Sequence, residues 1–289
     1  MKLHDDELDI SADLVRGLVD EQFPAWAGRP LRAVPAAGTD NVMFRLGDDL
    51  VVRLPRMPRS AGNVVKEQRW LPYLAPFLPL AVPAPVGLGR PAAGYPMPWS
   101  VYAWRPGDHR MGDSVAAATA LGDFVAALQA APVPADAPAA YRAGNYQKSD
   151  AYVREALGDL DVPGAAALWD AGLELPGWER APVWVHSDLL PTNVLYRDGR
   201  LDAVIDFGCA GVGDPACDLM AAWALFDPAA RQVFRNRLAV DDATWERGRA
   251  WALLFGLGAW HYYDTLKPEF AALGRRTVNQ TLTDRASST

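Results

Sequence analysis

The sequence His186-Ser187-Asp188-Leu189-Leu190-Pro191-Thr192-Asn193, followed at 206–208 by Asp-Phe-Gly, is the most informative stretch of this 289-residue chain. Short apolar runs at residues 183–185, 194–196 and 201–205 predict strands around it. An Asp-Gly pair at 198–199 is typical of the turn that joins two strands of a hairpin. We therefore expect a strand, a loop and a hairpin in that order, with the hairpin returning Asp206 to the loop.

Three polar side chains of this stretch suit phosphoryl transfer. Asp188, at the apex of the loop, can accept a hydroxyl proton, and Asn193 and Asp206 offer the hard oxygen atoms that Mg²⁺ prefers. Transfer from ATP then depends mainly on positioning and charge neutralisation. Any one Asp or Asn beside a turn is usually a turn former, and His186 alone is more often a packed core residue. We predict phosphoryl transfer because these residues together occupy the matching positions of the kinase patterns H-R-D-L-x-x-x-N and D-F-G.

The rest of the chain predicts an α+β protein with two lobes. Residues 1–105 contain a helix at 11–23 that Ser11 can cap, a helix at 63–74, and strands at 31–34, 42–46, 50–54, 86–88 and 99–104. Arg105-Pro106-Gly107 interrupts this pattern and is the expected hinge. Residues 106–289 are mostly helical, with the main helices expected at 114–130, 218–226, 228–238, 244–266 and 268–282. We expect a small antiparallel sheet in the first lobe and the catalytic loop and substrate site in the second.

The charge distribution narrows the classes of partner. The net charge is −7, which argues against a nucleic-acid partner because such proteins are usually basic. Through Arg105 there are 12 basic and 11 acidic residues, giving +1, whereas the remainder has 16 and 24, giving −8. This asymmetry suits an anionic nucleotide in the first lobe and a cationic small-molecule substrate in the second, although a solvated acidic surface has the same composition.

The composition also predicts the compartment. The first nine residues include four acids and no apolar run, unlike a signal peptide. The longest apolar stretch, at 251–260, has ten residues, about half of the ~20 that a spanning helix needs. The two cysteines, Cys209 and Cys217, are too few for a disulfide scaffold. We expect a cytoplasmic protein with reduced thiols and no membrane partner; monomer and homodimer remain equally open.

Three stretches, at 186–193, 204–208 and 211–219, resemble the aminoglycoside phosphotransferase family of the protein-kinase-like superfamily, and 38–41 and 50–56 extend the resemblance. The resemblance implies a two-lobed kinase-like fold that uses ATP, or in some members GTP, with Mg²⁺. It implies transfer of the γ-phosphoryl group to a hydroxyl of a small molecule. The implied roles are Asp188 as base, Asn193 and Asp206 as metal ligands, and Asp218 as a buried brace of the catalytic loop.

Two positions depart from the family pattern. Ser187 stands where the family often has Gly. Arg53 stands where the strand residue that contacts the nucleotide phosphates is normally Lys, and although Arg keeps the charge, its planar fork has a different geometry. We expect Arg53 to pair with Glu67 on the following helix, as the Lys and Glu of a kinase do.

Other nucleotide contacts are expected from position in the fold. Gly38 and Asn41 belong to a turn that can close over the phosphates, although it lacks a full G-x-G-x-x-G motif. Residues 101–104, which include Tyr102 and Trp104, precede the hinge and should offer backbone hydrogen bonds to the adenine.

Several alternatives remain open. A protein kinase is disfavoured because only nine residues separate Gly208 from Asp218 and no A-P-E motif follows. A catalytically inactive nucleotide-binding regulatory module is a second alternative, and Arg53 is its best argument. A kinase of a macrolide or another small metabolite is a third. Residues 260–269 combine aromatic and acidic side chains that could line the acceptor site or simply pack helices. The acidic balance favours an aminoglycoside-type antibiotic as acceptor.

Overall fold

The computed structural model describes residues 7–34, 40–92, 94–142 and 144–284, so Gly38 lies outside the described residues. The chain divides into two compact units. The first comprises Met1–Pro76, Ala81–Gly107 and Ile205–Gly208, and the second comprises Phe77–Leu80, Asp108–Val204 and Cys209–Thr289. Asp206 therefore belongs to the first unit, although the hairpin before it belongs to the second. The predicted lobes 1–105 and 106–289 stay a prediction.

The first unit is built on a small antiparallel sheet. Its strands are β1 (Leu31–Ala33), β2 (Asn41–Leu46), β3 (Leu50–Pro55), β4 (Pro85–Gly89) and β5 (Trp99–Ala103), in the order β1-β2-β3-β5-β4. The tight β2–β3 connection requires Gly47, whose φ of 64° favours glycine. The predicted small antiparallel sheet is confirmed.

Two helices pack against this sheet. Helix α1 (Ala12–Gln22) begins at the cap Ser11, whose Oγ accepts a hydrogen bond from Leu14 N at 3.1 Å, as predicted. It buries Val15, Leu18 and Val19 in a core shared with apolar side chains of β2, β3 and β5. Helix α2 (Ala61–Leu74) contacts β4 and β5 and carries Glu67 on its buried face.

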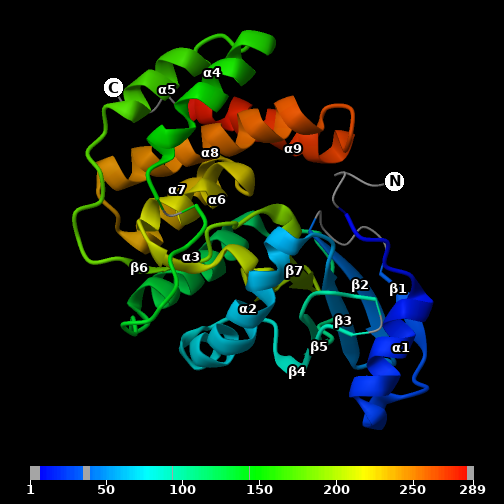
Figure 1. Cartoon of the computed structure of the whole chain (residues 1–289). Coiled ribbons are helices and arrows are strands. Elements are labelled where there is room, and N and C mark those ends of the chain that lie inside the picture. The colour runs from blue at the N-terminus through cyan, green and yellow to red at the C-terminus, as the bar shows by residue number, and fades with distance from the viewer. Residues whose placement is uncertain (1–6, 35–39, 93, 143, 285–289) are drawn as a thin grey trace. The chain divides into compact units, whose positions relative to one another are not determined.

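The second unit is mostly helical (Figure 1). Its main helices are α3 (Ser114–Ala130), α4 (Asp150–Asp159), α5 (Ala165–Leu173), α7 (Pro228–Leu238), α8 (Asp242–Tyr263) and α9 (Pro268–Thr283). Helices α8 and α9 lie side by side, and a Cβ added at Gly274 would meet the carbonyl oxygen of Gly256 at only 2.6 Å. Glycine at this crossing therefore permits the close helix contact.

Two short strand pairs position residues 186–193, the predicted catalytic loop, within the second unit. Strand β6 (Val183–Val185) pairs antiparallel with β9 (Gly211–Gly213), and β7 (Val194–Arg197) forms a hairpin with β8 (Arg200–Val204). The loop lies between β6 and β7 in sequence, as predicted. The α+β class is confirmed. Among the described residues, no helix is both long and apolar enough to cross a membrane.

The helix expected at 218–226 is present only in part. The chain instead forms a 3₁₀ helix over Pro215–Met220 and a short helix α6 over Ala221–Ala224. Asp214 caps the 3₁₀ helix by accepting a hydrogen bond from Ala216 N at 2.9 Å, and Asp227 caps α7 by accepting one from Ala230 N at 2.9 Å. The short segment between these two caps has no room for a long helix. The apolar run that suggested a longer helix is buried on all sides, and periodicity does not assign such a run.

Candidate active site

Asp218 holds the start of the catalytic loop in the second unit. Its Oδ2 accepts a hydrogen bond from His186 N at 2.8 Å, and its Oδ1 accepts one from Ser187 N at 2.6 Å. All three residues are fully buried. Burial raises the pKa of Asp218 to about 7, although the two backbone hydrogen bonds oppose that shift. The brace expected from the family resemblance is therefore present.

Asn193 fixes the other end of the loop. Its Nδ2 donates hydrogen bonds to Asp188 O and to Asp188 Oδ2, each at 2.9 Å. The 3₁₀ turn Pro191–Asn193 places this side chain, and only 7% of Asn193 is exposed. Because the amide nitrogen is occupied by Asp188, the amide oxygen is the atom left to ligate a cation.

Arg142 contacts Asp188 from outside the motif. Its Nη1 donates to Asp188 Oδ1 and also to Ser187 O, the latter at 3.2 Å. Both oxygens of the Asp188 carboxylate therefore have partners, one in Arg142 and one in Asn193. The sequence did not identify Arg142, which lies 46 residues before Asp188 and belongs to no pattern that we recognised.

Arg53 organises a charged cluster in the first unit. Its Nη1 donates to both carboxylate oxygens of Glu67 at 2.8 and 2.7 Å, and its Nη2 donates to Asp206 Oδ1 at 2.5 Å. The expected Arg53–Glu67 pair is confirmed, and the contact with Asp206 is new. Burial by itself would lower the pKa of Arg53, but the charges of Asp206 and Glu67 outweigh it and raise the pKa well above its usual value.

Two further predicted residues contact this cluster. With its amide oxygen turned to Arg53, Asn41 accepts hydrogen bonds from Nε at 3.2 Å and from Nη2 at 2.9 Å. Tyr102 donates its hydroxyl to Glu67 Oε2 at 2.6 Å, so its side chain braces the ion pair. Burial, together with the charge of Glu67, raises the pKa of Tyr102 far above its usual value and keeps this donor protonated.

Trp104 lies at the end of the same unit but outside the cluster. Its backbone N donates to Asp49 O at 2.7 Å, and the guanidinium of Arg45 lies 4.1 Å from its ring centroid. The nucleotide contacts predicted for Trp104, Tyr102, Asn41, Arg53 and Glu67 stay predictions, as does that of Gly38.

The expected magnesium ligands fit that ion chemically. Asn193 offers an amide oxygen, and Asp206 offers a carboxylate whose side chain is 39% exposed. Mg²⁺ prefers hard oxygen ligands, and the protein usually supplies only a few of them. Water and substrate phosphates complete the coordination shell. In the described part of the chain, no three His, Cys, Asp or Glu side chains gather into a metal site. An amide oxygen and a carboxylate are ligands that Mg²⁺ accepts, and the binding of one ion by both residues stays a prediction.

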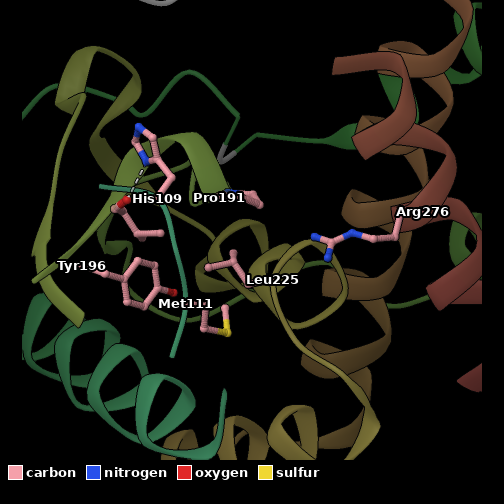
Figure 2. A pocket seen from close by; sticks show the side chains of 7 residues that line it. His109, Met111, Pro191, Tyr196, Leu225 and Arg276 are labelled. Atoms are coloured by element: carbon pink, nitrogen blue, oxygen red, sulfur yellow. Dashed lines mark hydrogen bonds between the residues drawn. The ribbon is translucent and has the colours of Figure 1, made fainter. Parts of the chain in front are cut away.

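A small pocket lies beside the catalytic loop in the second unit (Figure 2). Its volume is about 130 Å³, and its lining is mainly apolar, from His109, Met111, Pro191, Val194, Tyr196, Leu225 and Arg276. His109 Nδ1 lies 2.9 Å from Val194 O, and Arg276 Nη2 donates to Ala224 O. The buried hydroxyl of Tyr196 has no hydrogen-bond partner among the described residues. None of the described residues that line this pocket carries a carboxylate.

The aromatic and acidic residues at 260–269 pack the ends of α8 and α9. The ring of Tyr263 lies 5.1 Å from that of Phe270, and Asp264 pairs with Arg275 at 3.2 Å. Arg275 also lies 5.8 Å from the Trp260 ring. These contacts give the region a structural role, and its part in acceptor binding stays a hypothesis.

The fold is that of kinase-like phosphotransferases. Residues 32–251 match the model of the phosphotransferase enzyme family (APH), so this chain belongs to that family. The predicted family, the two-lobed kinase-like fold and the enzyme class, a small-molecule kinase with an alcohol group as acceptor, are confirmed. No curated protein matches the sequence of this chain.

Several solved structures share the fold. The GDP and kanamycin complex of APH(2")-IIia superposes with a TM-score of 0.73 at 19% identity, covering 93% of this chain and 98% of that one. The apoenzyme of macrolide 2'-phosphotransferase MphH from Brachybacterium faecium gives 0.60 at 25% identity, with the same coverage of 93% and 98%. A macrolide 2'-phosphotransferase type I gives 0.63 at 18% identity, covering 94% and 98%.

Proposed function

We propose that this protein transfers the γ-phosphoryl group of ATP, or of GTP, to a hydroxyl group of a small molecule. The observation that carries the proposal is the carboxylate of Asp188, which Asn193 and Arg142 hold at its two oxygens while the buried Asp218 holds the loop. A carboxylate oriented in this way is suited to accept the proton of an attacking hydroxyl.

The donor side rests on the first unit. Arg53 is a permanent cation that Glu67 orients through two hydrogen bonds, and Asp206 shares the same guanidinium. We propose that Arg53 contacts the nucleotide phosphates and that Asp206 and Asn193 ligate Mg²⁺. When bound, the ion would neutralise the negative charge of the phosphates. The presence of GDP, ADP and ATP in similar structures supports a nucleotide donor.

The proposed reaction is a displacement at the γ-phosphorus. The acceptor oxygen forms a bond to the γ-phosphorus as the bond between that phosphorus and the bridging oxygen of the diphosphate breaks. The hydroxyl proton passes to the Asp188 carboxylate. The chain's main contribution is to orient the reacting groups and to balance their charge.

Two acceptor classes have specific support. An aminoglycoside is the first candidate because residues after Arg105 carry a net charge of −8 and because similar structures hold kanamycin, streptomycin or gentamicin. A macrolide or another largely apolar alcohol is the second. Two macrolide 2'-phosphotransferases among the similar structures support the second class.

The test is release of ADP or GDP with Mg²⁺ across a panel of aminoglycosides, macrolides and small metabolic alcohols. We expect release that depends on one acceptor class and disappears in an Asp206→Ala control. Nucleotide binding without turnover across the panel would favour the inactive regulatory module. Absence of nucleotide binding would contradict the proposal and would indicate that Arg53 does not replace the usual lysine.

A further inference from the structure

The base of the proposed reaction is held by a cation that lies outside every recognised motif. Arg142 Nη1 donates to Asp188 Oδ1, and the two side chains are only 28% and 18% exposed. Burial alone would lower the pKa of Arg142, but the charge of Asp188 leads the opposing effects, and the pKa is raised. The guanidinium therefore stays charged, and a partly buried charge-assisted hydrogen bond of this kind is strong.

The backbone brings Arg142 to this position. Residues 138–140 run along β9, where Val212 N donates to Pro138 O at 2.8 Å and Ala140 N donates to Val212 O at 3.1 Å. Tyr141 N then donates to Cys209 O at 3.0 Å. A Cβ on Gly211 would lie 2.5 Å from Ala140 N, so the close approach of these two segments requires glycine there. The segment before Arg142 is thus fixed to the second unit by backbone bonds.

Ser187 links the catalytic loop to the same segment. Its Oγ accepts a hydrogen bond from Arg142 N at 2.9 Å, and its carbonyl oxygen accepts one from Arg142 Nη1. Ser187 adopts a φ of 66°, which is unfavourable for a residue with a Cβ and easy for the glycine that the family often has here. The hydroxyl offsets this cost because glycine has no group to bind Arg142 N.

We propose that Arg142 is a positioning residue for the phosphoryl transfer and that Ser187 is its anchor. Arg142 on Oδ1 and Asn193 on Oδ2 together fix the rotation of the Asp188 carboxylate. A fixed carboxylate presents its remaining lone pairs in one direction, toward which the acceptor hydroxyl must be oriented. The inference rests on the proposed function, because Arg142 acts on the reaction only through Asp188.

A purely structural role makes a different prediction. If Arg142 only joined two segments, its loss would lower the stability of the fold and leave turnover per folded molecule unchanged. If it positions Asp188, its loss lowers kcat and leaves the KM for the nucleotide unchanged. A 1 Å misplacement of a reacting group lowers rates by about 10²-fold, which sets the scale of the expected change.

The experiment compares Arg142→Ala, Arg142→Lys and Ser187→Ala with the unchanged protein. We expect kcat to fall by about 10²-fold in Arg142→Ala at constant nucleotide KM. Arg142→Lys should retain part of the kcat that Arg142→Ala loses. The fall in kcat should be smaller in Ser187→Ala than in Arg142→Ala. Guanidinium chloride, below the concentration that unfolds the protein, should partly restore Arg142→Ala. Arg154→Ala is the matched control, since Arg154 pairs with Asp150 and Asp170 on the exposed surface of the same unit.

Turnover is measured with the acceptor found in the panel and, separately, as slow hydrolysis of ATP, in which water takes the place of the alcohol. A folded Arg142→Ala protein with unchanged kcat in both assays would overturn the positioning role of Arg142 and leave the proposed function intact. If that variant does not fold, an unchanged kcat in Arg142→Lys and Ser187→Ala would overturn it. Silence of the unchanged protein in both assays would overturn the proposed function, and the role of Arg142 with it.

Discussion

Ser187 donates its backbone N–H to the fully buried carboxylate of Asp218 at 2.6 Å while adopting a left-handed φ of 66°. The left-handed region costs a residue with a Cβ about 1–2 kcal/mol. The bond to Asp218 is one of the contacts that offset this cost, and it sets the direction in which the chain enters the catalytic loop. The conformation of the loop therefore depends on a residue that follows it by about thirty positions.

Replacing Asp218 by Asn tests this dependence. The amide keeps the size of the side chain but places an NH₂ group against one of the two backbone donors, His186 N or Ser187 N. At pH 8, where Asp218 is ionised and both of its oxygens accept, we expect the free energy of unfolding to fall by about 1–3 kcal/mol and turnover to fall with it. Urea unfolding and acceptor-dependent ADP release measure the two effects. Wild-type stability and turnover in this variant would show that the loop does not need the carboxylate.

The same carboxylate should contribute to the pH dependence of stability. Burial raises the pKa of Asp218 from 3.8 to about 7, so the folded protein retains a proton that the unfolded chain loses. The contribution of Asp218 is therefore fully favourable below pH ~4, declines as the pH rises to about 7, and is constant above it. The slope is about 1.4 kcal/mol per pH unit within that window.

Unfolding free energies of the unchanged protein and Asp218→Asn at pH 5, 6, 7 and 8 measure this contribution. The unchanged protein should lose stability relative to the variant up to about pH 7 and then run parallel to it. Parallel curves throughout the range would contradict a raised pKa for Asp218.

Removing the guanidinium of Arg53 should affect both stability and nucleotide binding. Glu67 has a side chain only 2% exposed, and Arg53→Met leaves that charge without its cation. Loss of one partner of a buried ion pair costs about 3–5 kcal/mol. Nucleotide affinity, measured by calorimetry, should also fall in Arg53→Met. Arg53→Lys keeps the positive charge and should retain most of the nucleotide affinity. Equal affinity in Arg53→Met and the unchanged protein would exclude Arg53 from the nucleotide site.

Gly211→Ala tests the backbone contact that places Arg142. The added Cβ would meet Ala140 N, Ala139 C and Pro138 O at 2.5 to 2.6 Å, and backbone atoms cannot rotate away. We expect a loss of about 1–3 kcal/mol in stability and a lower kcat, because the segment that carries Arg142 must shift. Gly158→Ala, in α4 with no atom within 4 Å of the added Cβ, is the matched control and should be neutral or stabilising. A harmless Gly211→Ala would show that the two segments can separate without consequence.

The sequence predicted those parts of the site that local patterns determine. The strand, loop and hairpin around Asp188 follow from short apolar runs and a turn pair, and α3 and α7 occur over the predicted residues. The pairing of Arg53 with Glu67 was expected because a strand and the next helix place these residues in register with a known pattern.

The contacts that the sequence did not predict join residues far apart in the chain. An isolated β-bridge between residue 139 and β9 brings Arg142 to Asp188, and Arg53 bonds to Asp206 across 153 positions. In both pairs the two residues lie in separate elements, and no local sequence pattern spans the distance between them. The signal that was available for Arg142 was indirect. Ser187, as a serine in place of glycine, carries a hydroxyl that accepts a hydrogen bond from Arg142 N.

The most direct test of the account is turnover of Asp188→Asn, which keeps the size of the base and removes its ability to accept a proton. The account predicts that kcat for the acceptor identified in the panel falls by about 10²-fold or more while nucleotide affinity is unchanged. Asp188→Ala should show the same loss. Near-normal turnover in both variants, with the protein folded, would contradict the assignment of Asp188 as the base and with it the proposed mechanism.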